Sequence, residues 1–418
     1  MTKCLNVVVL LFVLSAAREC AADDWPQFRG PNRDGRSAET GLLKKWPEGG
    51  PKLLWFVEGL GEGFSSVAVA DGYVYTTGMV GNDKQGMLWA YGVDGSPKWN
   101  ASYGPEWKGS HPGARTTPTV DGDRVYVISG HGNLACFDAK TGEDKWQVDI
   151  LKRFGGKNIN WGISESALIF EDKVICTPGG KDACVAALNK VSGETIWTSK
   201  GLSDESAYCS PILVEAAGRK MVITVTARQI IGIDAQTGEV LWRQDNRPHK
   251  GKPRHINPNA PVYHDNALYV TSRFVGGLKL RISAGGTEVS ELWADEQLDP
   301  HHGGVVLVDG FIHGTDSRDE IWMCLNWDTG KIGYVDKLVG KGSVIYADGM
   351  LYCYGQDGAL ALVRPGASGY EMVSSFEIIE GTGPHWAHPA ISNGRLYIRH
   401  GHALMVYLIN SEGPAEKQ

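Results

Sequence analysis

The sequence contains no run of basic residues, and neither sign of charge dominates it. Its 418 residues include 41 Lys and Arg against 48 Asp and Glu, a net charge of −7, with both signs interspersed. Nucleic acids and anionic membrane surfaces are bound through clustered lysine and arginine. The composition therefore argues against nucleic acid or a membrane surface as the main partner.

Several short motifs that mark particular chemistry are also absent. There is no CxxC or CxxCH, so neither a thioredoxin-like site nor a c-type haem is indicated. There is no HExxH, no GxSxG and no GxxxxGK[ST], which removes support for a zinc hydrolase, a serine hydrolase and a phosphate-binding loop. No specific metal and no catalytic residue follow from the sequence.

Cysteine is scarce, with eight residues, of which six follow the N-terminal region: Cys136, Cys176, Cys184, Cys209, Cys324 and Cys353. Cys176 and Cys184 flank one turn symmetrically, so a cross-strand disulfide is geometrically possible. Free cysteines that pack as small buried apolar residues are the other interpretation. The sequence leaves both open.

The only long apolar run lies at the N-terminus. Lys3 precedes an apolar stretch over residues 5–17, and Ala21 and Ala22 precede a polar start at Asp23. The stretch is short for a membrane span, so it predicts a signal peptide over residues 1–22, cleaved near Ala22, and a periplasmic or secreted protein with no transmembrane segment after cleavage. Lipidation at Cys20 is disfavoured by the neighbouring Arg18 and Glu19, and an uncleaved anchor is the remaining alternative.

Glycine, in contrast, is abundant, with 54 residues, and it marks a repeat. The same short turn and hydrophobic strand recur at intervals of 39 to 50 residues, with turns that start at Asp71, Asp121, Glu171, Ala217, Asp265, Asp309, Asp348 and Asn393. A period near 45 residues built only from strands and turns is typical of propeller blades. The repeat predicts an all-β, eight-bladed β-propeller with four antiparallel strands per blade.

The ends of the repeat region predict how the ring closes. The eighth repeat supplies only three strands before a polar tail at residues 411–418, whereas residues 51–55 match an outer strand. We expect this N-terminal strand to complete the last blade, because closure removes an exposed sheet edge. The propeller then spans residues 51–410. We expect residues 23–50 to form an extended arm that Trp25 and Phe28 anchor on the propeller surface, and a partner-binding role for these aromatic residues is the alternative.

Tryptophans end the outer strands of six repeats: Trp55, Trp99, Trp146, Trp197, Trp242 and Trp293. The segments 135–146 and 232–242, each with Thr-Gly-Glu before the tryptophan, resemble the docking motif of the quinoprotein-like family, whose repeats are named after pyrroloquinoline quinone (PQQ). The resemblance covers nearly all of the mature chain. It implies that each tryptophan packs on the adjacent blade. Blades six and seven lack this tryptophan, so we expect less regular packing there.

The family resemblance implies two kinds of function. PQQ-dependent alcohol dehydrogenases stack the quinone on a channel tryptophan and hold Ca²⁺ with oxygen ligands. Trp161 or Trp386 would then be the platform, with Arg115, Asn160 and Glu165 as polar partners. The adjacent cysteine pair of those enzymes is absent here. The propeller lipoprotein of the outer-membrane β-barrel assembly machinery shares the repeat and binds proteins without a quinone.

The loops that lead into the innermost strands carry the candidate site residues. These loops converge on one mouth of the channel, and six of the 12 histidines lie in them. The candidates for ligand binding are Arg115, Asn160, Trp161, Glu165, Tyr208, Asn257, His301, His302, His385, Trp386 and His388. The same loops also carry Phe64, His111 and Lys341. The alternative is that these polar side chains only serve a wet channel mouth.

Together these patterns favour a binding or scaffold protein of the cell envelope with a polar, histidine-rich funnel. We expect a monomer that needs no cofactor and whose partner is an envelope protein or a small polar ligand. The alternative function is PQQ-dependent oxidation of an alcohol or sugar, including polymeric alcohols, with PQQ and Ca²⁺ as cofactors.

Overall fold

The computed structural model describes residues 24–246 and 256–411. The predicted signal peptide, Cys20 and nearly all of the polar tail lie outside the described residues. Within these ranges, no helix has the length and apolar character needed to cross a bilayer.

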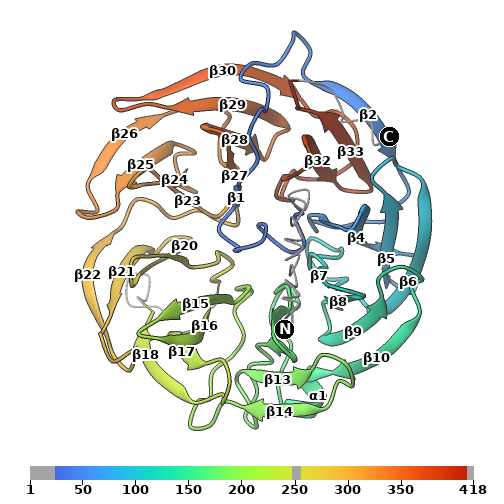
Figure 1. Ribbon diagram of the computed structural model, residues 1–418, viewed down its shortest axis with the longest axis vertical. Coiled ribbons are helices and arrows are strands. Elements are labelled where there is room, and N and C mark those ends of the chain that lie inside the picture. The colour runs from blue at the N-terminus through green and yellow to red at the C-terminus, as the bar shows by residue number, and fades with distance from the viewer. Residues whose placement is uncertain (1–23, 247–255, 412–418) are drawn as a thin grey trace, which may run out of the picture.

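Eight sheets form a ring, and the first strand of each blade faces the central channel (Figure 1). Successive apolar residues of a strand point to opposite faces of the sheet. Each sheet therefore packs on the sheets of both neighbouring blades, and its apolar residues are buried. The first four blades are β3 (Ala68–Ala70), β4 (Tyr73–Val80), β5 (Gln85–Gly92) and β6 (Pro97–Pro105); β7 (Thr119–Asp121), β8 (Arg124–Ile128), β9 (Asn133–Asp138) and β10 (Asp144–Asp149); β11 (Leu168–Phe170), β12 (Lys173–Cys176), β13 (Ala186–Asn189) and β14 (Thr195–Thr198); β15 (Ile212–Ala216), β16 (Arg219–Val225), β17 (Gln229–Asp234) and β18 (Val240–Asp245). The single helix of the described residues, α1 (Ile150–Phe154), follows β10.

The last four blades complete the ring, and the N-terminal strand closes it. These blades are β19 (Val262–His264), β20 (Ala267–Ser272), β21 (Gly276–Ile282) and β22 (Val289–Asp295); β23 (Val306–Val308), β24 (Phe311–Thr315), β25 (Trp322–Asn326) and β26 (Ile332–Asp336); β27 (Gly342–Ala347), β28 (Met350–Gly355), β29 (Ala359–Pro365) and β30 (Tyr370–Glu377); β31 (Ala390–Ser392), β32 (Arg395–His400), β33 (Ala403–Leu408) and β2 (Lys52–Val57). β2 pairs antiparallel with β33, from Lys52 opposite Leu408 to Val57 opposite Leu404. The predicted eight-bladed propeller and its closure by the N-terminal strand are confirmed.

The docking tryptophans join consecutive blades through one repeated contact. In five of six cases the indole Nε1 donates to a backbone carbonyl of the next blade: Trp55 to Val93 (2.9 Å), Trp99 to Ala139 (3.0 Å), Trp146 to Lys190 (3.1 Å), Trp197 to Ala235 (3.2 Å) and Trp293 to Trp327 (3.1 Å). Trp242 is the exception, since its Nε1 is buried without a partner among the described residues. The turn of the following blade departs from the motif, and its Gly286 lies against Met221 instead. Each docked indole thus adds apolar burial and one hydrogen bond between neighbouring sheets.

The glycine of the docking turn is required by close contact with the tryptophan. A Cβ at Gly238 would lie 2.5 Å from Trp197, whereas a Cβ at Gly218 meets nothing within 4 Å. Both glycines have left-handed φ values, +77° and +71°. We expect Gly238→Ala to lower the free energy of unfolding by about 2–4 kcal/mol, and Gly218→Ala by about 1–2 kcal/mol, because only the first adds a clash to the backbone strain. Urea denaturation of both variants checks this, and equal losses would contradict the clash.

Blades six and seven replace the docking tryptophan with a tyrosine pair. Tyr334 of β26 and Tyr370 of β30 lie edge to face with ring centroids 4.6 Å apart. Tyr370 also meets His313 Nδ1 at 3.0 Å. Aromatic contact therefore continues across this junction in a different geometry.

The cysteines do not form disulfides in the described part of the chain, where all six are free and buried. Cys176 lies opposite Ala186 in the β12–β13 ladder, two residues beyond Cys184. Because Cys184 precedes β13, its thiol points elsewhere and lies 3.4 Å from the Asp204 carbonyl oxygen. The free-cysteine interpretation fits this structure.

The arm enters the central channel instead of lying on the outer surface (Figure 1). Trp25 forms a bridge with Val69 of the innermost strand β3, with both N···O distances 2.9 Å. Further along, β1 (Arg36–Ser37) pairs in parallel with β27, two blades away from β3 around the ring. Between these two contacts Arg33 reaches blades three and four, on the opposite side from β27, so the arm crosses the channel.

Two buried arginines attach this arm to the innermost strands. Arg33 Nη1 donates to the carbonyl oxygens of Ser166 and Pro211, both at 2.9 Å, and Nη2 donates to that of Ala167. Arg29 Nη2 donates to the Val305 carbonyl oxygen at 2.6 Å. Unpaired carbonyls at the starts of several inner strands are thus satisfied by side chains of the arm.

Candidate functional site

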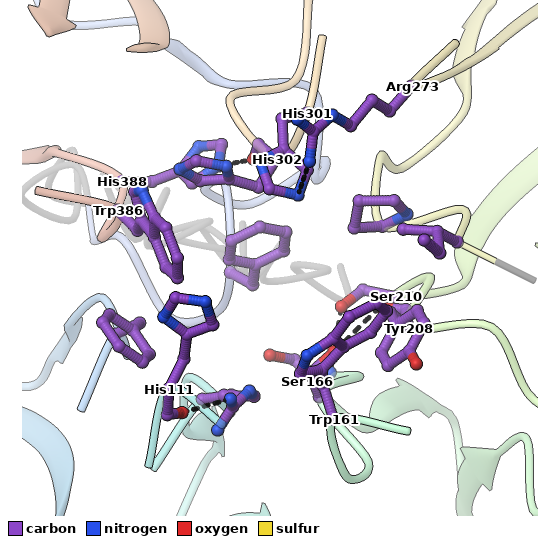
Figure 2. A pocket seen from close by; sticks show the side chains of 16 residues that line it. His111, Trp161, Ser166, Tyr208, Ser210, Arg273, His301, His302, Trp386 and His388 are labelled. Carbon is purple, nitrogen blue, oxygen red and sulfur yellow. Dashed lines mark hydrogen bonds between the residues drawn. The ribbon is translucent and has the colours of Figure 1, made fainter. Parts of the chain in front are cut away.

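A pocket of about 260 Å³ lies at the channel mouth above the arm (Figure 2). It is lined by Phe28, Phe64, His111, Arg115, Trp161, Ser164, Ser166, Tyr208, Ser210, Ile256, Pro258, Arg273, His301, His302, Trp386 and His388. Most of these residues lie in loops that join an outer strand to the innermost strand of the next blade. The antiparallel order of the four strands brings those loops to one side of the ring.

Seven of the eleven predicted site residues line the pocket: Arg115, Trp161, Tyr208, His301, His302, Trp386 and His388. The other four do not. Asn160 is exposed beside Trp161. The remaining three, Glu165, Asn257 and His385, are buried and make hydrogen bonds within the protein.

These three residues contact neighbouring strands and loops of the propeller and do not line the cavity. Glu165 Oε1 accepts from the Thr177 amide at 2.5 Å, and burial raises the pKa of this carboxyl to about 7. Asn257 Nδ2 donates to the Thr226 carbonyl oxygen at 2.8 Å. His385 Nδ1 lies 2.5 Å from Tyr354 Oη, and its ring stacks on His400.

Trp386 lies at the centre of a ring cluster that forms one wall of the pocket. Its ring centroid is 4.9 Å from Phe64, 5.0 Å from His111, 5.0 Å from His302 and 6.0 Å from His301. Its indole Nε1 is buried and has no partner among the described residues. The wall therefore offers aromatic surface and one unused hydrogen bond donor.

The charged side chains of the lining are all basic. Arg115 Nη1 donates to the Gly113 carbonyl oxygen at 2.8 Å, and burial lowers the pKa of its guanidinium to about 10, so it stays charged at neutral pH. Arg273 Nη1 lies 3.1 Å from His301 Nε2. Among the described lining residues none is Asp or Glu. The pocket thus favours negative charge.

Three of the pocket histidines, His301, His302 and His388, are neutral at pH 7. Burial, reinforced by neighbouring positive groups, lowers the pKa of His301 to about 4, that of His388 to about 3 and that of His302 well below its usual value. His388 uses both ring nitrogens, since Nε2 donates to the His302 carbonyl oxygen at 2.8 Å and Nδ1 faces Arg29 Nη1 at 3.3 Å. Both ring nitrogens of His302 are buried without a partner in the described structure.

The floor of the pocket comes from the arm. Phe28 lines the cavity and meets the His388 ring edge to face with centroids 5.0 Å apart. Arg29 lies beneath and contacts the same histidine. The arm therefore contributes directly to the lining of the pocket.

Sequence reasoning missed Phe28 and Arg273 as lining residues. Arg273 lies in the turn between β20 and β21, and such turns open on the same side as the loops that lead into the innermost strands. That topology could have pointed to Arg273. Phe28 gave no comparable indication, since only the path of the arm places it in the pocket.

The lining suits part of a PQQ–Ca²⁺ site only. Trp161 and Trp386 provide flat aromatic surfaces, and Arg115 and Arg273 could pair with carboxylates. Ca²⁺ takes six to eight oxygen ligands, mostly carboxylates and carbonyls. No group of three His, Cys, Asp or Glu in the described ranges could hold a metal ion. The aromatic acid therefore fits the chemistry of the lining, whereas Ca²⁺ and an aspartate base do not.

Comparisons with known proteins agree with the propeller. A family model described as outer membrane protein assembly factor BamB matches residues 40–153 and 88–333. Quinoprotein ethanol dehydrogenase of Pseudomonas aeruginosa is 27% identical over 159 residues, which cover 35% of this chain and 25% of the enzyme. Outer membrane protein assembly factor BamB of Burkholderia pseudomallei is 28% identical over 186 residues, 44% of this chain and 42% of that protein. The matches thus span less than half of either relative.

Solved structures share the fold at low identity. BamB from Moraxella catarrhalis aligns with a TM-score of 0.64 and 16% identity over 86% of this chain and 100% of that one. A europium-containing methanol dehydrogenase aligns with a TM-score of 0.67 and 10% identity, over 91% of this chain and 90% of the enzyme. Because the matched family model covers well over half of the sequence, the chain belongs to the PQQ-repeat propeller family described as outer membrane protein assembly factor BamB.

Proposed function

We propose that this protein is an exported, non-catalytic binding protein of the cell envelope whose channel mouth holds a small polar ligand. The observation that carries the proposal is the composition of the pocket. Among the described residues it has aromatic rings, arginines and neutral histidines, but no carboxylate that could act as a base or bind Ca²⁺. Such a lining can bind and orient a ligand without the groups that alcohol oxidation needs.

An envelope protein is a second candidate partner, and the family membership supports it. The matching family is described by an assembly factor of outer membrane proteins. A propeller suits this role because its loops present a broad face around the channel. Crosslinking of the full chain in the envelope should then give a discrete adduct, and its absence would count against a protein partner.

PQQ-dependent alcohol oxidation is the alternative, favoured by the pocket tryptophans and by dehydrogenase relatives. In that function PQQ would accept two electrons from the alcohol. Trp161 or Trp386 would support its ring, and Arg115 or Arg273 would hold its carboxylates.

Addition of PQQ with Ca²⁺ separates the two functions. We expect no ethanol-dependent reduction of an artificial electron acceptor, because the described pocket offers no base and no Ca²⁺ ligands. The melting temperature with PQQ should be the same in Ca²⁺ and in a chelator. Ethanol-dependent dye reduction, or a Ca²⁺-dependent rise in melting temperature, would overturn the non-catalytic proposal.

A further inference from the structure

Two half-buried side chains of the pocket carry buried polar atoms whose hydrogen bonding capacity is unused. Both ring nitrogens of His302 and the indole Nε1 of Trp386 lack partners within residues 24–246 and 256–411. Both side chains line the cavity. An unpaired buried polar group costs about 1–3 kcal/mol, and native proteins rarely leave such groups unused. These atoms therefore indicate a ligand that accepts hydrogen bonds.

Hydrogen bonding fixes which histidine is available. Arginine only donates, so His301 Nε2 accepts from Arg273 and His388 Nδ1 accepts from Arg29. His388 Nε2 then donates to the His302 carbonyl oxygen. Of these three neighbouring histidines, His302 is the one with both ring nitrogens unpartnered in the described structure, so its proton can lie on either nitrogen to suit a ligand.

The chemical asymmetry of the pocket gives the ligand an orientation. Figure 2 shows His301, His302 and Arg273 on one side and Trp161 on the opposite side. The first side is basic and offers donors, and the described lining has no carboxylate to neutralise it. The opposite side is aromatic. A ligand that satisfies both sides has an acidic end and an apolar, planar body.

We propose that the pocket binds an organic carboxylate with an aromatic body, its carboxylate held by Arg273 and His302 and its ring facing Trp161. This inference rests on the proposed binding function and specifies its ligand class. Arg273 would supply a charge-assisted hydrogen bond, and His302 a second donor. Lys341, the other permanent positive group near this end, pairs with Glu320 at 2.7 Å, so a monocarboxylate suits Arg273 better than a phosphate dianion does.

Proton uptake should accompany binding. Burial and the positive groups around His302 hold its pKa well below the usual value. The facing groups are Arg273 on the β20–β21 turn, Lys341 before β27, and the neighbours His301 and His388. A bound carboxylate offsets this positive field and raises the pKa of His302. Because the protonated form then binds more tightly, affinity should increase as pH falls from 7.5 to 5.5.

Titration calorimetry with 2-naphthoate and its neutral analogue 2-naphthamide tests the ligand class. At pH 5.5 we expect 2-naphthoate to bind at least tenfold more tightly than 2-naphthamide. The affinity for 2-naphthoate should also be at least threefold higher at pH 5.5 than at pH 7.5. The binding enthalpy should also vary with buffer, which reports the proton taken up. Equal affinities for both probes would overturn the carboxylate inference and leave the binding function standing. Binding of neither probe would count against both.

Two variants assign the roles of the residues. Arg273→Gln should lower the affinity for 2-naphthoate by about tenfold and leave the affinity for 2-naphthamide unchanged. His302→Gln keeps a hydrogen bond donor but cannot titrate, so it should retain binding and lose the buffer-dependent enthalpy. Arg364→Gln is the matched control, because Arg364 is exposed on β29 and pairs with Glu371. Circular dichroism checks that each variant is folded. Full affinity of Arg273→Gln for 2-naphthoate would refute the assignment. Tight binding of inorganic phosphate alone would refute it as well.

Discussion

Replacement of Arg33 with alanine is expected to lower the free energy of unfolding by about 3–5 kcal/mol. The guanidinium is buried and donates to the carbonyl oxygens of Ser166, Ala167 and Pro211. Removal leaves the Ser166 and Pro211 carbonyls without this donor, since they precede the ladders of β11 and β15, whereas the Ala167 carbonyl keeps the Thr119 hydroxyl at 2.8 Å. Each hydrogen bond to a charged group contributes about 1.5–3 kcal/mol, so even a partial loss is large.

The effect should extend beyond stability, because Arg33 holds the segment that forms the pocket floor. Phe28 lies five residues earlier on the same arm and lines the cavity. When the arm detaches, its backbone becomes accessible, so Arg33→Ala should also be cleaved faster by a protease within residues 24–46. Arg33→Lys keeps the charge but not the planar fork, so it should recover only part of the loss.

A second arm arginine provides the control for this prediction. Arg36 is exposed, its Nη1 donates to the Leu307 carbonyl oxygen at 3.0 Å, and its guanidinium lies 5.4 Å from the Tyr346 ring centroid. Arg36→Ala should therefore cost less than about 1 kcal/mol in the same urea titration. If both variants unfold at the urea concentration of the wild type, the arm does not depend on Arg33 as the structure indicates.

The ring could be predicted from the sequence because each blade is built from contacts that are local in the chain. The turns at Asp71 and Asp121 and the docking tryptophans repeat with the blade, so one copy supports the interpretation of the next. The path of the arm could not be predicted in the same way. Arg29 and Arg33 bind main-chain carbonyls, and any residue type can supply such an acceptor, so no sequence pattern marks these contacts.

The candidate site was predicted at the level of loops but not of side chains. Strand order brings Trp161 and Glu165 to the same mouth of the channel, and the sequence shows this. Which way each side chain turns depends on nearby unpaired backbone groups. Glu165 turns to the Thr177 amide, whereas Trp161 lies over the cavity and donates to Ser110 Oγ at 3.0 Å. Such choices depend on distances that appear only after folding.

Acidification should destabilise the protein strongly between pH 7 and pH 5. Five buried or half-buried histidines have folded-state pKa values lowered by burial, to about 3 or 4 for four of them: His301, His302, His313, His385 and His388. The unfolded chain protonates these groups below about pH 6.5, whereas the folded protein does not until much lower pH. Their contribution to stability is therefore present above pH 6.5 and is lost as pH falls.

Two buried glutamates have the opposite effect on the pH dependence of stability, but they are fewer than the five histidines. Burial raises the pKa of Glu106 and of Glu165 to about 7, so the folded state holds these protons while the unfolded chain has released them. Their contribution is present below about pH 4.5 and is lost as pH rises to 7. Near pH 5.5 the unfolded state still binds about two to three more protons in total. The free energy of unfolding should thus fall by about 2–4 kcal/mol per pH unit between pH 6 and pH 5.

Substitution of His313 tests this attribution away from the pocket. His313 is buried in β24, and its Nδ1 lies 3.0 Å from Tyr370 Oη. In urea titrations at several pH values, His313→Gln should reduce the slope by about 1.4 kcal/mol per pH unit, the equivalent of one proton. Tyr370→Phe is the matched control, because it removes the same hydrogen bond and keeps the imidazole. It should lower stability by a similar amount at every pH, whereas an unchanged slope in His313→Gln would show that other groups cause the acid sensitivity.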